Sequence, residues 1–202
     1  MKILLYGGTF DPPHNGHMNN LKAATAAVDP DLVVVMPAGV PPHKAASGTP
    51  ALMRYRMCRC FEELFTEEDA PKMELSRWEI DRAEQGHSNY TVDTLQMLAQ
   101  THSGARLYLT IGSDMLLTFT QWRRWEEILR ICTLVAVSRE EGDLPELKQA
   151  AEELEQAGGK ILFAPAKAIE MASKDFRRGE APMEALPLSV QAFVKEHHLY
   201  GR

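Results

Sequence analysis

The residues best suited to chemistry lie near the amino end, in the segment GGTFDPPHNGH at positions 7–17. Gly7 and Gly8 let backbone N–H groups approach a ligand without side chains in the way. A helix that begins near Gly16 points the positive end of its dipole into the same space, which favours a phosphate. His14 and His17 then share one face of that helix and can donate hydrogen bonds to phosphate oxygens as charge builds up during transfer. The segment therefore predicts a phosphate site that needs no nucleophile from the protein.

The histidine pair also has other interpretations. Its spacing fits neither the dinucleotide-binding GxGxxG nor the P-loop GxxxxGK[ST]. Taken alone, such a pair is more often structural, with His14 in a loop and His17 as a capping or core residue. A zinc site is less favoured, because no third ligand stands at a recognisable spacing. The choice among these alternatives depends on the rest of the chain.

Composition limits the class of protein. The chain has 202 residues, 45% hydrophobic and 25% charged, which suits one domain with a substantial core. A net charge of −6 argues against a general nucleic-acid binder. The sequence has no apolar run of membrane-spanning length and no signal peptide, so we expect a cytoplasmic protein without a membrane partner. Cys58, Cys60 and Cys132 form no CxxC pair and are expected to be reduced thiols.

Short apolar runs alternate with longer amphipathic stretches along the whole chain. The runs predict strands at 3–6, 32–36, 107–111, 134–137 and 161–163, and the stretches predict helices at 16–28, 50–65, 91–100, 125–131, 144–157 and 188–197. Thr49 is expected to cap a helix whose first residue is Pro50, and Gly158-Gly159 is typical of a helix stop. The alternation predicts an α/β fold: one Rossmann-like, doubly wound parallel sheet with helices on both faces. Ligands of such sheets bind beyond the carboxyl ends of the strands, where the first glycine-rich turn lies.

Following an N-terminal strand, GGTFDPPHNGH resembles the HxGH turn of a nucleotidyltransferase superfamily, whose members join a nucleoside triphosphate to a phosphate and release pyrophosphate. The resemblance implies that His14 and His17 contact the triphosphate and stabilise the transition state at the α-phosphorus. It also implies that Thr9 binds a phosphate and that Phe10 helps to hold the turn.

Four further segments resemble the nicotinate-nucleotide adenylyltransferase branch of that superfamily. They are PAGVPPHK at 37–44, NYTVDTL at 89–95, IGSDM at 111–115 with QWRRWEEI at 121–128, and LPLSVQAFVKEHHLY at 186–200. The first ends in Lys44, which would face phosphates, the alternative being a solvated surface lysine. In the second, the family has serine where this chain has Asn89; Tyr90 and Thr91 would bind the pyridine carboxylate, and Thr91 is also placed to cap a helix.

In the third segment, Gly112 and Asp114 would lie against the adenosine, with a helix start as the common alternative for the aspartate. Trp122 would stack on the pyridine ring while Trp125 stays in the core. Arg123 would add positive charge beside the pyridine carboxylate.

The C-terminal part, about 168–202, is expected to complete the ATP site. Where the family has ISSTxIR, this chain reads IEMASKDFR at 169–177. Ser173 and Arg177 match that pattern, and Lys174 can supply by charge what a threonine supplies by hydrogen bond. The ATP-binding residues implied by the resemblance are Gly7, Gly8, Thr9, Phe10, Gly16, Gly112, Asp114, Arg139, Ser173, Lys174 and Arg177; the catalytic ones are His14, His17 and Lys44.

The resemblance implies transfer of the adenylyl group of ATP to nicotinate mononucleotide, with Mg²⁺ accompanying ATP and no metal held by the protein alone. The later segments speak against pantetheine-phosphate adenylyltransferase and glycerol-phosphate cytidylyltransferase, which share the HxGH turn. Nicotinamide mononucleotide remains an alternative acceptor, because it differs by one carboxylate-to-amide change. A nucleotide-binding sensor that has lost the chemistry is the rival from another class, and a homo-oligomer is left open.

Overall fold

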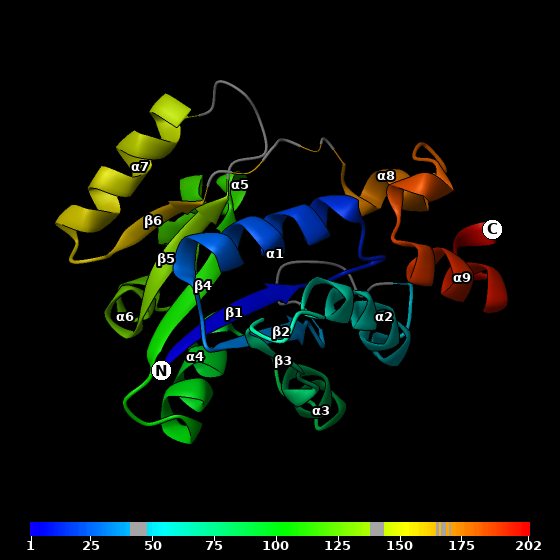
Figure 1. Ribbon diagram of the computed structural model, residues 1–202. Helices are drawn as coiled ribbons and strands as arrows, with labels where there is room; N and C mark the ends of the chain where they lie inside the picture. The colour runs from blue at the N-terminus through cyan, green and yellow to red at the C-terminus, as the bar shows by residue number, and fades with distance from the viewer. Residues whose placement is uncertain (41–47, 138–143, 165, 167–168, 170) are drawn as a thin grey trace.

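A computed structural model describes residues 1–40, 48–137, 144–164, 166, 169 and 171–202 (Figure 1). Lys44 and Arg139 lie outside the described residues, so their proposed roles stay predictions.

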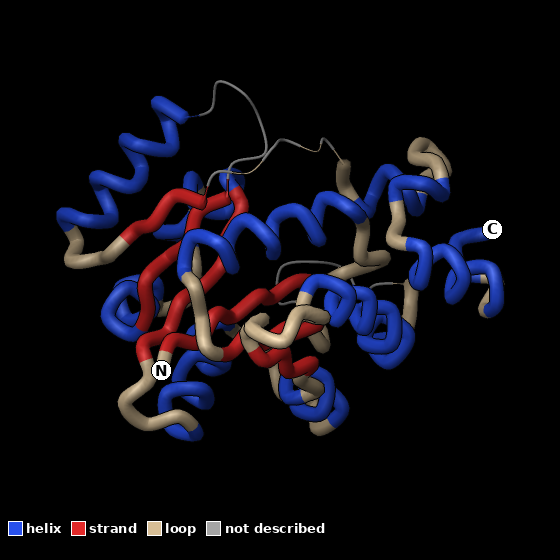
Figure 2. Tube along the Cα trace, in the orientation of Figure 1, coloured by secondary structure: helices blue, strands red, loops and turns tan. Residues whose placement is uncertain are grey.

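Within the described residues, six parallel strands form one sheet in the order β3-β2-β1-β4-β5-β6 (Figures 1 and 2). The strands are β1 (Lys2–Gly8), β2 (Leu32–Pro37), β3 (Lys72–Leu75), β4 (Arg106–Gly112), β5 (Cys132–Val137) and β6 (Ile161–Ala164). This order and the helices on both faces confirm the predicted Rossmann-like, doubly wound fold.

Along each inner strand, alternate side chains point into two separate hydrophobic cores on opposite faces of the sheet. Ile3 and Leu5 of β1 face a core completed by helices α4 (Thr91–Thr101), α6 (Trp125–Ile131) and α7 (Leu144–Gln156). Leu4 and Tyr6 face the opposite core, which includes helices α1 (Asn15–Val28), α2 (Ala51–Met57) and α9 (Leu188–Glu196). Because side chains alternate between the faces of a strand, a strand buried on both sides reads as a continuous apolar run.

Two elements at the edge of the sheet were not predicted. Strand β3 alternates exposed and half-buried side chains, because it is an edge strand, and therefore presents no apolar run. Helix α3 (Trp78–Glu84) follows it and buries Ile80 alone among its residues. The short helix α5 (Ser113–Leu117) was expected only as a possible start at Asp114.

The predicted helix 50–65 is divided. An α-helix ends at Met57 and a 3₁₀ helix continues over Cys58–Leu64. Pro50 occupies the capping position itself, so the prediction that Thr49 caps this helix is wrong. The side chain of Thr49 instead hydrogen-bonds Tyr200.

The predicted stop after α7 is confirmed. Gly158 adopts φ of +92°, a conformation that favours glycine, and the Gly159 N–H donates to the carbonyl of Leu154 at 2.9 Å.

The chain leaves β1 toward β2 and β3 and then returns to place β4 on the other side of β1. The switch point therefore lies between the carboxyl ends of β1 and β4, which deliver Gly7–Thr9 and Gly112–Asp114 to the same region. No helix in the described ranges has both the length and the apolar character needed to cross a membrane.

Candidate active site

Two cavities meet at this switch point. The histidine cavity is lined by residues of β1, α1, β4, α5 and the C-terminal part, among them His14, His17, Gly112, Asp114, Ser173, Lys174 and Arg177. The tryptophan cavity is lined from the other side by Glu79, Asn89, Tyr90, Thr91, Trp122 and Arg123, among others. Both are lined by Gly7, Gly8, Thr9, Thr110 and Met115. The tertiary structure thus brings most of the predicted site residues into two adjoining spaces.

The two histidines cap helix α1 reciprocally. The backbone N–H of His17 donates to Nδ1 of His14 at 3.3 Å, and that of His14 donates to Nδ1 of His17 at 3.2 Å. Their rings stack with centroids 3.6 Å apart. Because each Nδ1 accepts a hydrogen bond, a neutral ring carries its proton on Nε2. The capping and phosphate-binding interpretations are therefore compatible: capping orients two Nε2 donors beside the helix N-terminus.

Close packing in the turn explains two of its glycines. Phe10 has φ of 49° and places its ring within 5.1–5.4 Å of the rings of Tyr6, His17 and Phe61. A Cβ at Gly8 would come within 2.8 Å of the Phe10 ring. A Cβ at Gly16 would come within 3.0 Å of the His14 ring, so glycine at this position leaves room for the His14 side chain.

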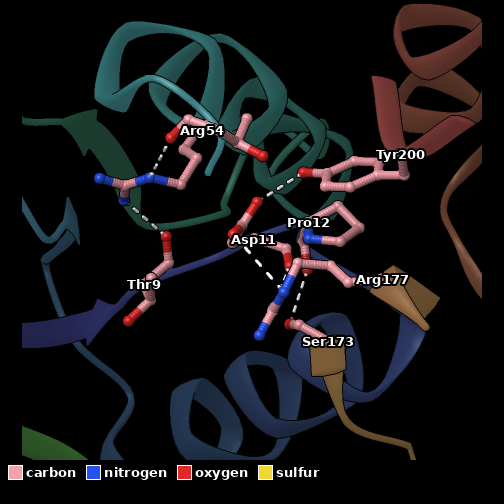
Figure 3. A network of polar contacts seen from close by, with 8 residues as sticks. Thr9, Asp11, Pro12, Arg54, Ser173, Arg177 and Tyr200 are labelled. Carbon is pink, nitrogen blue, oxygen red and sulfur yellow. Dashed lines mark hydrogen bonds and ion pairs between the residues drawn. The ribbon is translucent and has the colours of Figure 1, made fainter. Parts of the chain in front are cut away.

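The C-terminal part is attached to the histidine turn through Asp11 (Figure 3). Asp11 is 2% exposed and accepts a hydrogen bond from the Tyr200 hydroxyl at 2.7 Å. Arg177, at the end of helix α8 (Ser173–Arg177), donates to the Asp11 carbonyl at 2.6 Å and forms an ion pair with its carboxylate at 3.8 Å. Ser173 donates to the Pro12 carbonyl at 2.9 Å.

Ser173 and Arg177 therefore hold the turn, although both also line the histidine cavity as expected for phosphate ligands. Lys174 lies between them, is exposed, and lines the same cavity.

A buried arginine that the sequence analysis did not identify binds the backbone of the glycine-rich turn at positions 7–17. Arg54 is 2% exposed and donates to the carbonyls of Thr9 at 2.7 Å, Gly39 at 3.0 Å and Thr49 at 3.4 Å. Burial lowers its pKa, and the nearby charge of Asp11 opposes that shift. One guanidinium thus joins the loops after β1 and β2; its contact with Thr9 is drawn in Figure 3. Nothing in the helical pattern marks this arginine as buried.

The tryptophan cavity presents aromatic faces and one cation. The Arg123 guanidinium lies 4.5 Å from the centre of the Tyr90 ring, and Trp122 packs against Phe119 at 5.2 Å. Trp125 packs on the core, as predicted, without lining this cavity. Tyr90 occupies the capping position of α4 and Thr91 is its first helical residue, so the prediction that Thr91 caps the helix is wrong.

Glu79 is the titratable group that sequence reasoning missed in this cavity. It accepts a hydrogen bond from the Thr94 hydroxyl at 2.7 Å. Burial raises the pKa of Glu79 to about 7; the Thr94 hydrogen bond lowers it, and the charge of Asp93 adds to the rise. The residue belongs to α3, which the sequence pattern did not predict.

Gly112 and Asp114 lie at the start of α5. Gly112 is its capping residue, and Asp114 is exposed in its first turn, so the helix-start alternative is correct. Both nevertheless line the histidine cavity, where an adenosine is expected.

The described residues contain no group of three or more histidine, cysteine, aspartate or glutamate side chains that could hold a metal ion. The three cysteines are buried free thiols, as expected, and burial raises the pKa of Cys132 to about 12.

Comparison with known proteins agrees with this architecture. Residues 5–179 match the profile of the cytidylyltransferase-like family. The chain is 36% identical to a probable nicotinate-nucleotide adenylyltransferase of Neisseria meningitidis serogroup B, covering all of this chain and 99% of that protein. It is 34% identical over the full length of both chains to the protein of the same name from Solibacter usitatus.

Among solved structures, the fold is similar to Plasmodium falciparum nicotinic acid mononucleotide adenylyltransferase complexed with APC. The TM-score is 0.76 at 16% identity, covering 99% of this chain and 97% of that one. The same enzyme complexed with NaAD gives a TM-score of 0.75 at 17% identity over the same shares of the two chains. With the full-length relatives above, these findings show that the chain belongs to the nicotinate-nucleotide adenylyltransferase family of cytidylyltransferase-like proteins.

Proposed function

We propose that this protein transfers the adenylyl group of ATP to nicotinate mononucleotide, forming nicotinate adenine dinucleotide and pyrophosphate, a step of NAD synthesis. The observation that carries the proposal is the meeting of two unlike cavities at Gly7–Thr9. One offers imidazoles, a helix N-terminus and cations, which suit a triphosphate. The other offers aromatic faces and Arg123, which suit an anionic pyridine ring.

The reaction needs positioning more than a protein nucleophile. A phosphate oxygen of the mononucleotide attacks the α-phosphorus of ATP in line, and the bond from that phosphorus to the bridging oxygen breaks as pyrophosphate leaves with the electron pair. Nε2–H groups of His14 and His17 would donate to oxygens that gain charge in the transition state. Lys174 would neutralise the departing phosphates, and Lys44, whose role follows from the resemblance alone, would add to this positive charge.

The acceptor would lie in the tryptophan cavity with its phosphate toward Thr9. Trp122 would stack on the pyridine ring. Arg123 and the backbone at Tyr90 and Thr91 would meet the carboxylate. The positive charge of Arg123 favours the acid substrate over nicotinamide mononucleotide. A negative charge on Glu79 would oppose this preference, and protonation of Glu79 removes that charge.

We propose that Mg²⁺ enters with ATP. The described carboxylates form no cluster that fits a resident metal site. Of the described residues that line the histidine cavity, Asp114 is the one with an exposed carboxylate. The ion would therefore be held by phosphate oxygens and water. The three buried free thiols are consistent with a cytoplasmic location.

A pyrophosphate-release assay with ATP, Mg²⁺ and nicotinate mononucleotide tests the proposal directly. We expect turnover with the acid mononucleotide and a lower kcat/KM with the amide. A nucleotide sensor would bind ATP and release no pyrophosphate, and a higher kcat/KM with the amide would overturn the choice of acceptor. Omitting Mg²⁺ tests the cofactor: turnover should then be lost.

A further inference from the structure

The tryptophan cavity contains a buried amide whose hydrogen bonds the protein does not supply. Asn89 is 5% exposed, lines the cavity and directly precedes Tyr90, the capping residue of α4. Neither its Nδ2 nor its Oδ1 has a hydrogen-bond partner within the described part of the chain. A buried amide left in this state destabilises the folded protein, and such groups need a physical explanation.

The distribution of unpaired buried side-chain atoms points to a ligand. In the described structure they occur on Thr25, Arg82, Asn89 and Thr110. Of these, Asn89 and Thr110 line the tryptophan cavity, and Thr110 also lines the histidine cavity. Asn89 is the one of these four residues with two unpaired side-chain atoms, the amide donor Nδ2 and the carbonyl acceptor Oδ1. A ligand with a matching polar group would remove the cost of burying that amide.

The neighbours of Asn89 define the chemistry of that group. Tyr90 and Trp122 line the same cavity with aromatic surface, and Arg123 lies over Tyr90 as a cation. A flat ring that bears a carboxylate or carboxamide matches this surrounding. A carboxylate can accept from Nδ2 but leaves Oδ1 unpaired, whereas a carboxamide can pair with both atoms.

We propose that Asn89 is a specificity-determining residue: its Nδ2 donates to an oxygen of the carboxylate or carboxamide on the pyridine ring, and its Oδ1 lets the site retain activity on the amide. This inference rests on the proposed function, because it assigns the pyridine end of the acceptor to this cavity. It adds a side-chain contact made by Asn89, which stands where the family motif SYTxDTL has serine.

Two variants and a control test the proposal. Asn89→Leu keeps the approximate volume and removes both polar atoms, whereas Asn89→Asp keeps the shape, removes the donor and adds negative charge. Thr25→Val is the matched control, because it also removes an unpaired buried atom but lies on α1 outside both cavities. Each protein is assayed for kcat and KM with ATP and with both mononucleotides, for calorimetric binding of nicotinate mononucleotide, and for Tm.

Asn89→Leu should lower kcat/KM for nicotinate mononucleotide by about 10- to 100-fold, the usual range for a lost hydrogen bond to a charged group. Its KM for ATP should stay within about twofold of the original, because the substitution does not alter the histidine cavity to which ATP is assigned. Its Tm should not fall, because removing an unpaired amide costs the empty protein nothing. Asn89→Asp should lower kcat/KM for the acid at least about 10-fold more than for the amide, because like charges then meet. Thr25→Val should leave all kinetic values unchanged.

A structural role for Asn89 predicts the opposite pattern: a lower Tm in Asn89→Leu with equal small losses for all substrates. That pattern, or equal losses for acid and amide in Asn89→Asp, would overturn the inference. Failure of the proposed function is recognised separately in the unmodified protein. If it releases no pyrophosphate but binds nicotinate mononucleotide, loss of that binding in Asn89→Leu still supports the contact; if it binds no mononucleotide, both ideas are wrong.

Discussion

Replacing Tyr200 with phenylalanine tests whether the C-terminal end holds the histidine turn. The hydroxyl donates to the Asp11 carboxylate at 2.7 Å, and Asp11 is buried. A hydrogen bond to a charged group contributes about 1.5–3 kcal/mol, and its loss leaves a buried carboxylate oxygen short of a donor. For a chain of this length, we expect Tm to fall by about 3–12 °C, at about 2–4 °C per kcal/mol.

The effect on turnover should be smaller than the effect of losing a histidine. Arg177 and Ser173 still donate to the carbonyls of Asp11 and Pro12, so the turn keeps two of its connections to the C-terminal part (Figure 3). We expect kcat to fall by less than about 100-fold, the loss associated with a misplacement of about 1 Å.

Urea unfolding followed by tryptophan fluorescence, together with steady-state turnover, measures both effects. Tyr55→Phe is the matched control, because its hydroxyl donates at 3.2 Å to the carbonyl of Leu75, a neutral acceptor on β3 rather than a carboxylate in the turn. It should cost about 0.5–1.5 kcal/mol and leave kcat unchanged. A double-mutant cycle with Asp11→Asn isolates the pair, and a coupling energy below about 0.5 kcal/mol would refute the reasoning.

Three further predictions concern residues that line the cavities or hold the loops around them. His17→Ala should fold but lose about 100-fold or more in kcat. His17→Asn can keep an acceptor for the N–H of His14, so it should regain stability without regaining turnover. A near-normal kcat in either variant would exclude a catalytic role for His17. Arg54→Met should lower the free energy of unfolding by about 3 kcal/mol or more in urea titrations, because three carbonyls lose their donor. Arg54→Lys should restore only part of that free energy, because one ammonium cannot reach all three carbonyls as the planar guanidinium does. Full stability in Arg54→Lys would contradict this explanation. The folded-state pKa of Glu79 is raised to about 7, so ionisation opposes folding and stability should decline by up to about 3 kcal/mol as pH rises from about 4.5 to 7. Glu79→Gln should remove that decline, raising the unfolding free energy at about pH 8 more than at about pH 5; an equal change at both pH values would show that Glu79 does not titrate in this range.

Local features of the sequence predicted the inner part of the fold well. Strands β1, β2, β4 and β5 are buried on both faces and read as apolar runs, and the edge strand β6 keeps the apolar run Ile161–Phe163. Helices α1, α4 and α6 begin and end within a residue or two of their predicted bounds. Strand β3 and helix α3 were missed because they bury too few side chains to produce an apolar run or a periodic signal. The capping positions before α2 and α4 were each displaced by one residue, since propensity does not fix the last hydrogen bond of a helix.

The same distinction applies to the site. His14 and His17 were predicted to share a face because a three-residue spacing fixes that within one helical turn, and the structure stacks their rings. Glu79 and Asn89 came to the site through α3 and the loop before α4, where no spacing rule relates them to Trp122. The phosphate, pyridine and metal roles assigned from the resemblance stay predictions, including those of Lys44 and Arg139.

The sequence by itself determined the apolar strands, the glycine-rich turn and the histidine pair, because each is visible in residue types and spacings within a short stretch of the chain. The tertiary structure alone decided how the turn is held. Tyr200 reaches Asp11 across 189 positions of sequence, and Arg54 joins Thr9 to Gly39 from another helix. It also decided that Asn89 is buried in the cavity that Trp122 lines, with its amide unpaired. Such partners depend on how whole elements pack, since a buried polar group is defined by what surrounds it in space rather than by its neighbours along the chain.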